Sequence, residues 1–85
     1  MAMGFILISI ALAKQHAVYD ELLKVKEILE LYPLFGEYDL IAKIEAEESN
    51  LFGQVVVDKV RSIPGVIDTK TLRPICDLRY FFNSG

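Results

Sequence analysis

The sequence contains little of what catalytic, redox or metal sites are usually built from. Among its 85 residues are one cysteine, Cys76, one histidine, His16, and no tryptophan. A single cysteine excludes an intrachain disulfide and a CxxC site, which fits a reducing cytoplasm. His16 stands at the start of a predicted helix, where we expect a solvated or capping side chain. We therefore expect no catalytic residue, no cofactor and no metal.

Positive charge is also sparse. Nine Lys and Arg residues against twelve Asp and Glu residues leave a net charge of -3, and the basic residues are scattered along the chain. Because no basic patch is available for a phosphate backbone, we expect no direct binding of nucleic acid. The apolar run at 4–13 is too short to cross a bilayer and no basic residue precedes it, so we expect no signal peptide and no membrane partner.

Apolar residues, in contrast, are abundant. They make up 53% of the chain, while charged residues make up 25%. A domain of this size leaves about 40% of its unfolded surface exposed, so a lone monomer would be marginally stable. The chain also carries more apolar surface than one small core can use, which predicts self-association.

Hydrophobic periodicity predicts four strands and two helices. The strands are expected at 5–12, from 28 to an end at Phe35-Gly36, at 39–46 and at 66–72, and the helices at 16–26 and 49–63. The order βαββαβ predicts an α+β, ferredoxin-like fold, with an antiparallel sheet and both helices on one face. The other face would carry Ile41 and half of the apolar side chains of the first strand. Two such faces are expected to pack together as a dimeric α+β barrel.

The buried sides of these elements can be read from residue spacing. They are expected to comprise Val18, Leu22, Val25 and Leu29, then Leu40, Ala42, Ile44 and Ala46, then Phe52, Val56, Val60 and Ile63. Pro33 lacks a backbone donor, which predicts an edge strand or a bulge. Ser49 or Asn50 is expected to cap the second helix, and the Pro-Gly pair at 64–65 to end it.

The segment Gly36-Glu37-Tyr38-Asp39 predicts a tight turn. Glycine accepts a positive φ there, and Asp39 could bond its own backbone. The same turn could instead bind a ligand: its backbone N–H groups would hold a carboxylate and Asp39 would take an ammonium group. From the residues alone, local bonding of Asp39 is favoured. Tyr38 could close such a pocket, but we favour a contact between subunits.

Two motifs, GEYDL at 36–40 and VRSIPGV at 60–66, resemble the effector-binding domain of the Lrp/AsnC transcription regulators. The resemblance covers about 5–72. It implies dimers that assemble further, commonly to octamers, and an amino acid bound between neighbouring dimers. It also favours the ligand role of the turn. The binding residues that the resemblance implies are Gly36, Glu37, Tyr38 and Asp39, with Thr69 and Thr71 as weaker candidates.

DNA-binding members of that family carry an N-terminal helix-turn-helix, whereas the predicted sheet here begins almost at Met1. The chain therefore resembles the stand-alone form of the domain, called a RAM domain. We expect a ligand-binding and oligomerisation domain at 1–74, and a tail at 75–85 that could add a fifth strand. Such a protein would be cytoplasmic, would bind an amino acid, and would modulate transcription through Lrp/AsnC-type regulators as partners.

Two other functions are compatible with the predicted fold. Dimeric α+β barrels include enzymes such as cofactor-free monooxygenases, but these need a polar, titratable pocket, and the inner positions expected here are Leu, Ile, Val, Phe and Ala. We therefore predict that the protein is not an enzyme. A structural subunit that has lost ligand binding is the second alternative.

Overall fold

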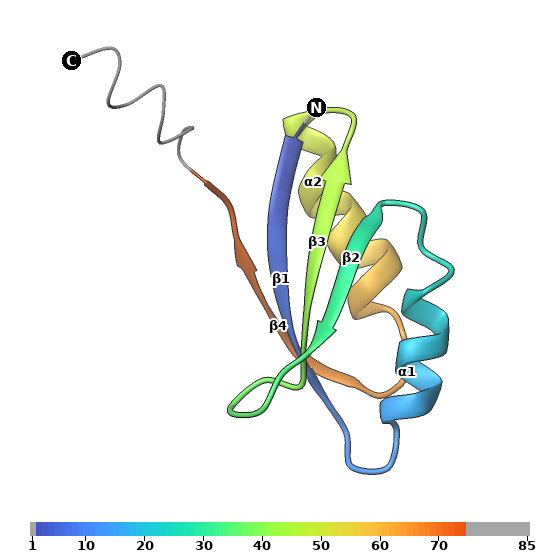
Figure 1. The fold of residues 1–85 in the computed structure, drawn as a ribbon. Helices are drawn as coiled ribbons and strands as arrows, with labels where there is room; N and C mark the ends of the chain where they lie inside the picture. Colours follow the sequence, from blue (N-terminus) through green and yellow to red (C-terminus); the bar gives the residue numbers. More distant parts are fainter. Residues whose placement is uncertain (1, 75–85) are drawn as a thin grey trace, which may run out of the picture.

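The computed structural model describes residues 2–74, which form four strands and the helices that pack on them (Figure 1). The elements are β1 (Ala2–Ile10), α1 (Gln15–Leu22), β2 (Ile28–Pro33), β3 (Leu40–Ala46), α2 (Ser49–Val55), the π-helical η1 (Val56–Arg61) that continues α2, and β4 (Val66–Leu72). This order confirms the predicted ferredoxin-like α+β plan. The predicted strand within 75–85 lies outside the described residues, and the domain boundary at residue 74 stays a prediction.

The four strands form one antiparallel sheet in the order β2-β3-β1-β4. The most apolar strand, β1, is central, and β2 and β4 form the edges. Strand β2 ends at Pro33, before the expected end at Phe35-Gly36, and it lies on one of these edges, where a missing N–H group removes no interstrand bond. The edge position that this proline predicted is therefore confirmed.

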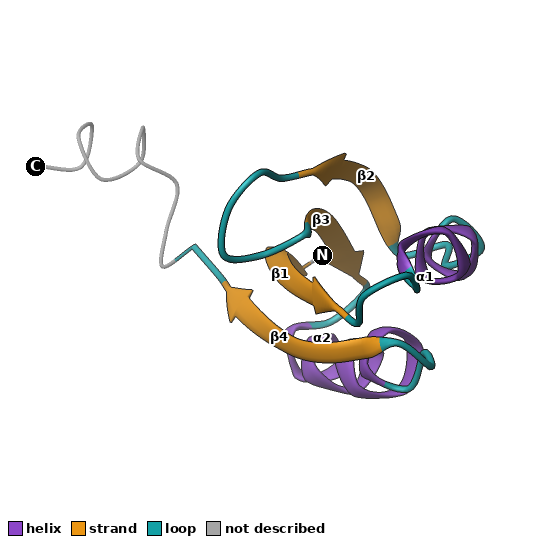
Figure 2. Ribbon diagram, turned by 90° about the horizontal axis from the view of Figure 1, so that it is seen from below, coloured by secondary structure: helices purple, strands orange, loops and turns teal. Residues whose placement is uncertain are grey.

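The core lies between the sheet and the helices, which are on the same side of it (Figure 2). Even-numbered residues of β1 and β3 face this side, because side chains alternate along a strand. The buried residues include Ile6, Ile8, Leu40, Ala42, Ile44 and Ala46 from the sheet, and Val18, Leu22, Phe52, Val56, Val60 and Ile63 from the helical side. The predicted alternation at 40–46 and the predicted stripe of the second helix are both confirmed.

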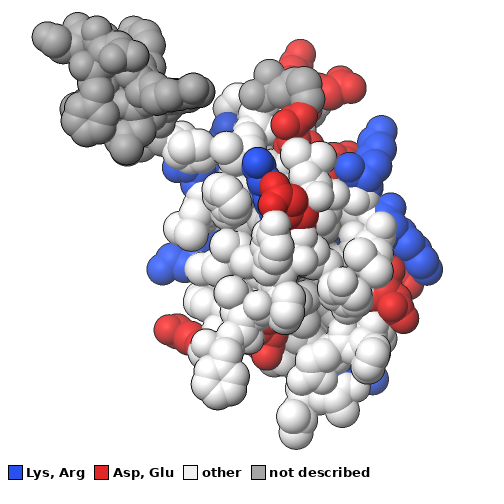
Figure 3. Space-filling model, viewed as in Figure 1, with Lys and Arg blue, Asp and Glu red and all other residues white. Residues whose placement is uncertain are grey.

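The opposite side of the sheet is not covered by any element within 2–74. Phe5 and Leu7 of β1 lie on it together with Ile41 of β3, which pairs with Leu7, and all three are only half-buried. Figure 3 views this side and shows uncharged side chains over most of the middle of the molecule, with charged ones mainly toward its margins. The predicted bare apolar face is present in the single chain.

Helix α1 is shorter than predicted. It ends at Leu22, whereas the expected end was residue 26. After it, the N–H groups of Lys24 and Val25 bond to carbonyl oxygens three residues earlier, at 3.1 Å, as the chain turns toward β2. The prediction was wrong because Val25 and Leu29 continue the helical spacing, although Leu29 belongs to β2.

The predicted cap of the second helix was also wrong. Glu48 is the N-cap residue, Ser49 is the first helical residue, and no side chain within 2–74 caps the helix. The Ser49 hydroxyl instead accepts a hydrogen bond from Arg73 at 3.1 Å, across the end of β4. Termination by the Pro-Gly pair is confirmed, since Gly65 follows the helix with φ +103°.

The bounds of β1 differ from those predicted. The strand covers residues 2–10 rather than 5–12, so the apolar Leu12 lies in the following loop with 90% of its surface exposed. Ala13 adopts φ +68°, which turns the chain toward α1. The N–H of Ala11 bonds to the carbonyl of Gly65 at 2.8 Å and holds the base of this loop.

Candidate ligand-binding site

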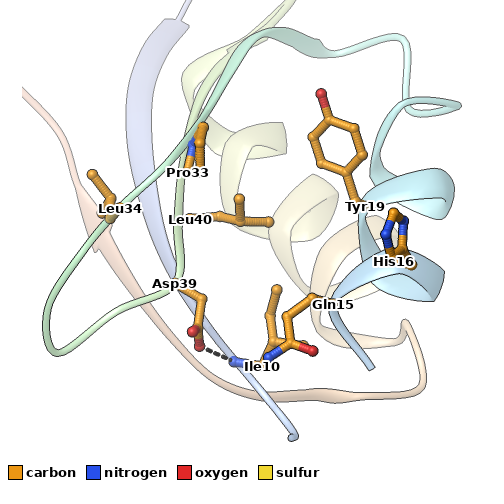
Figure 4. Close-up of a pocket in the computed structure, with 8 residues that line it drawn as sticks. All are labelled: Ile10, Gln15, His16, Tyr19, Pro33, Leu34, Asp39 and Leu40. Atoms are coloured by element: carbon orange, nitrogen blue, oxygen red, sulfur yellow. Dashed lines mark hydrogen bonds between the residues drawn. The ribbon is translucent and has the colours of Figure 1, made fainter. Parts of the chain in front are cut away.

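A cleft of about 420 Å³ opens at one end of the sheet, between α1 and the loop that joins β2 to β3. This volume is within the ~300–1,000 Å³ typical of small-molecule sites. Its lining residues, drawn in Figure 4, are Ile10, Gln15, His16, Tyr19, Pro33, Leu34, Asp39 and Leu40. The β2–β3 loop with its flanking residues thus meets, at the cleft, the end of β1 and the first turns of α1, which precede it in the sequence.

The cleft has an apolar body and one acidic end. Ile10 and Leu40 are core residues, each only 6% exposed, so they present the edge of the hydrophobic core to the cleft. Tyr19 and Leu34 are more exposed. In Figure 4, Leu40 lies between Asp39 at one end of the cleft and the Tyr19 ring at the other.

Asp39 is held firmly by backbone bonds. Its side-chain oxygen Oδ2 accepts a hydrogen bond from the N–H of Ile10 at 2.7 Å, and its own N–H donates to the carbonyl of Ile8 at 2.9 Å. The predicted local bonding within the turn was wrong, because the bonded partner is 29 residues away. Since a carboxylate has about four lone-pair sites, Asp39 keeps the capacity to bind a ligand cation.

The segment before Asp39 is not the predicted tight turn. Six residues, 34–39, separate β2 from β3, and the loop is closed by the N–H of Leu34, which donates to the carbonyl of Asp39 at 2.8 Å. Gly36 has φ +152°, which glycine adopts readily. Gly36 and Glu37 are exposed and Tyr38 is half-buried, and these three do not line the cleft. Of the four predicted turn residues, Asp39 alone lines it.

Thr69 and Thr71 lie elsewhere in the sheet. They pair with Ile8 and Ile6 across the β1–β4 ladder, which puts them on the helix-covered face of the edge strand β4. Strand β1 separates β4 from β3 and from the β2–β3 loop. The structure therefore does not bring the two threonines to the cleft, and a binding role for them stays a prediction.

Sequence reasoning missed the contribution of α1. His16 is exposed, as expected for a solvated side chain, but it lines the cleft together with Gln15 and Tyr19. Helical spacing could have indicated that Gln15 and Tyr19 act together, because positions four residues apart share one face of a helix. Where that face points depends on how α1 packs on the sheet, which the spacing does not show.

Outside the cleft, three interacting polar side chains, Glu30, Tyr32 and Lys43, lie on the uncovered face of the sheet. The Tyr32 hydroxyl donates a hydrogen bond to Glu30, and the Lys43 ammonium lies 3.4 Å from the other carboxylate oxygen. The Tyr32 bond, with Lys43 second, lowers the pKa of Glu30 below its usual value, and the same bond raises the pKa of Tyr32. This face is therefore apolar along β1 and ion-paired toward β2.

None of the helices in 2–74 combines the length and the apolar character needed to cross a membrane. Within the same residues, no three His, Cys, Asp or Glu side chains are grouped so that they could hold a metal ion.

Comparison with known proteins identifies the family. The family described as "Lrp/AsnC ligand binding domain" matches residues 3–75. The HTH-type transcriptional regulator FL11 of Pyrococcus abyssi is 40% identical over 73 residues, covering 82% of this chain and 46% of the regulator. The chain belongs to the Lrp/AsnC ligand-binding domain family, as its two motifs indicated. It spans about half the length of the curated relatives it matches.

Solved structures agree with this assignment. The crystal structure of the hypothetical protein PHS023 from Pyrococcus horikoshii has a TM-score of 0.80 and 35% identity, covering 91% of this chain and 93% of that one. The transcriptional regulator NMB0573 of Neisseria meningitidis, solved as an L-Met complex, has a TM-score of 0.75 and 26% identity, covering 91% of this chain and 51% of that one. The curated relatives are transcription regulators and not enzymes, so the monooxygenase alternative has no support.

Proposed function

We propose that this chain is a self-associating module that binds an α-amino acid and acts in transcription regulation with Lrp/AsnC-type regulators. One observation carries the proposal: a carboxylate, Asp39, is oriented by a backbone bond at the end of an apolar cleft. The L-Met complex of NMB0573 supports an amino acid as the ligand.

The geometry suits an amino acid for a physical reason. An ammonium group needs an anionic partner when it leaves water, and Asp39 is a carboxylate that lines the cleft. Because its Oδ2 is already fixed on Ile10, the carboxylate would lose little freedom on binding. An apolar side chain of such a ligand would lie on Leu40.

Self-association is supported by the uncovered face of the sheet. Phe5, Leu7 and Ile41 form an apolar strip that a second copy could bury by packing sheet against sheet. Such dimers would assemble further, to an octamer in the arrangement that we expect. Ligand binding would regulate the protein if it favoured one assembly over another, since a ligand shifts an equilibrium only through different affinity for the two states.

The test is Asp39→Asn, measured by isothermal titration calorimetry against a panel of the twenty amino acids. Asparagine keeps an oxygen that can accept the bond from Ile10 and removes the charge, so the loop should be retained while the charge-assisted bond is lost. We expect affinity to fall about tenfold or more. Glu37→Gln is the matched control, because it removes one charge from an exposed residue of the same loop that does not line the cleft.

Unchanged affinity in Asp39→Asn would show that the ligand binds elsewhere. Light scattering coupled to size exclusion, run with and without the ligand, tests whether ligand binding changes the assembly. An amino acid that binds without changing the mass of the assembly would contradict regulation by oligomerisation. If the wild-type chain binds no amino acid, the structural-subunit alternative is favoured.

A further inference from the structure

We propose that two copies of this chain pair edge to edge, with the segment 75–81 of each copy added as an antiparallel strand to the open edge of β4 in the other. Residues 76–81 lie beyond the part of the chain that matches the family, which ends at residue 75. The interface is distinct from the uncovered face of the sheet. It would link the proposed dimers to one another, and in that respect alone it rests on the proposed function.

Strand β4 has an open edge that a further strand could join. It lies at one margin of the sheet (Figure 2), and no element within 2–74 pairs with its outer side. From Asp68 to Leu72 it pairs with β1 without a break, so its outer backbone groups form a regular row. The other edge strand, β2, is interrupted by a register shift after Ile28 and ends at Pro33, both of which hinder strand addition. Of the two edges, β4 is therefore the one suited to pairing.

The segment that follows β4 carries complementary charges at the same spacing. Asp68 and Lys70 are exposed and share the uncovered face of the sheet, and Asp77 and Arg79 are also two residues apart. An antiparallel pairing can place Lys70 opposite Asp77 of the second copy. In that register Asp68 lies opposite Arg79, close enough for an ion pair. Two-fold symmetry then repeats both pairs on the other half of the interface.

The same charges disfavour the neighbouring registers. A slip of two residues in one direction would put Lys70 opposite Arg79. A slip of two in the other direction would put Asp68 opposite Asp77, and like charges directly opposite are destabilising. A slip of one residue would move the charges of the added strand to the other face of the sheet. One register is therefore favoured.

This register also covers exposed apolar residues of β4. Ile67 is 67% exposed and Leu72 is 43% exposed in the single chain. Tyr80 of the second copy would lie opposite Ile67. Ile75 would lie opposite Leu72, so apolar burial would favour the pairing in addition to the ion pairs.

A second copy fits this register better than the segment of the same chain. Within one chain the register would need a two-residue hairpin loop made of Arg73 and Pro74. Such loops require a positive φ at the first position. Within 2–74 the only non-glycine residue with a positive φ is Ala13, so Arg73 does not adopt this turn. Its side chain instead continues the alternation of β4, on the helix-covered face, 4.7 Å from the centre of the Phe52 ring.

Edge pairing between two single chains is expected to be weak, because each exposed ion pair contributes little. A sheet-packed dimer would present two such edges, and its assemblies would then be joined by two kinds of two-fold interface. Light scattering therefore reports mainly on the sheet packing. A covalent trap is the suitable measurement for the edge.

The trap is a disulfide to Cys76. In the favoured register Thr71 lies opposite Cys76 of the second copy, and opposite residues have Cα atoms about 4.5–5.5 Å apart, which a disulfide spans. We expect oxidised Thr71→Cys to run as a covalent dimer on a non-reducing gel. Thr69→Cys is the matched control, because its diagonal distance to Cys76, about 7–8 Å, is too long. The wild-type chain gives the background from Cys76 alone.

Charge reversal tests the cause of the pairing. In the Thr71→Cys chain, Lys70→Glu puts like charges opposite at two symmetric positions and should slow cross-linking about tenfold. Adding Asp77→Lys restores opposite charges and should restore the rate. Lys14→Glu is the matched control, because Lys14 is the exposed N-cap residue of α1, and the rate should not change.

The other outcomes would overturn the inference. A monomer of Thr71→Cys with an internal disulfide would show that the segment pairs with its own β4. Cross-linking of Thr69→Cys as fast as Thr71→Cys would show that the register is wrong. No cross-linking in either chain, or an unchanged rate after Lys70→Glu, would refute the edge pairing. Amino-acid binding and sheet packing would still stand, because calorimetry and light scattering test them separately.

Discussion

Gly4, in the central strand β1, is predicted to provide the space into which Phe52 packs. It lies on the helix-covered face of β1, and a Cβ atom added there would be 2.7 Å from Cζ of Phe52 and 3.0 Å from the carbonyl oxygen of Leu72. Phe52 is 1% exposed and is among the largest fully buried side chains. The absent side chain of Gly4 is thus the space that the Phe52 ring occupies.

The change in the free energy of unfolding expected for Gly4→Ala combines two opposing effects. Inserting a methyl group into a well-packed core typically costs about 1–3 kcal/mol. Replacing glycine by alanine within a strand stabilises the folded state by about 0.5–1 kcal/mol, because alanine loses less backbone freedom on folding. We therefore expect Gly4→Ala to lower the free energy of unfolding by about 0.5–2 kcal/mol.

Thermal and urea unfolding at one fixed protein concentration would measure this change, since the proposed self-association would make the midpoint depend on concentration. A loss of about 1 kcal/mol corresponds to about 4–8 °C in a domain of this size. Gly53→Ala is the matched control, because a Cβ atom added at this helical glycine would meet no atom within 4 Å beyond its own stretch of helix. It should stabilise the protein by about 0.5–1 kcal/mol.

A double-mutant cycle tests the stated cause. Phe52→Leu alone leaves a cavity and should be destabilising. Combined with Gly4→Ala, it should be less harmful than the sum of the two changes by about 1 kcal/mol or more, because the smaller side chain makes room for the methyl group. Additivity within about 0.5 kcal/mol would refute the reasoning.

Two further predictions concern an ion pair and the sheet face. The Lys59 ammonium lies 2.7 Å from the Glu27 carboxylate. Its hydrogen bond is the main cause that lowers the pKa of Glu27 below 4.5. The ion pair therefore stabilises the fold above pH 4.5, and this contribution is lost as the pH falls through the lowered pKa. Lys59→Met should therefore cost about 0.5–1 kcal/mol at pH 7 and less near pH 3, whereas Lys24→Met, which removes a more exposed pair, should cost little in urea unfolding at either pH. Leu7→Glu should convert the proposed dimer to a monomer in light scattering, because it puts charge in the middle of the apolar strip. Val57→Glu, a similar change at an exposed position of η1, should not, and a Leu7→Glu dimer of unchanged mass would contradict sheet-to-sheet packing.

Much of the fold was predictable because local periodicity reports which side of an element is buried. The strict alternation from Leu40 to Ala46 could be read directly, since apolar side chains two residues apart must share a face of a strand. Element ends were less predictable. At the end of α1, Val25 continues the helical spacing but lies in the turn that leads to β2, so the stopping point depends on where the next strand must start.

The candidate site was predictable only in part. The GEYDL motif identified the loop and Asp39, but the sequence suggested a local bond for that carboxylate. Its partner is the N–H of Ile10, because the sheet order brings the end of β1 beside the start of β3. Gln15 and Tyr19 also line the cleft because of tertiary structure, since α1 packs over that end of the sheet.

The sequence by itself therefore determined the order of the elements, the buried sides of β3 and of the second helix, and the family. These depend on residue spacing and on motifs, which are properties of short segments. Only the tertiary structure decided that the methyl-sized space at Gly4 is filled by Phe52, and that Asp39 lies across a cleft from Tyr19. Such contacts join residues far apart along the chain, and their geometry arises only when the helices pack on the assembled sheet.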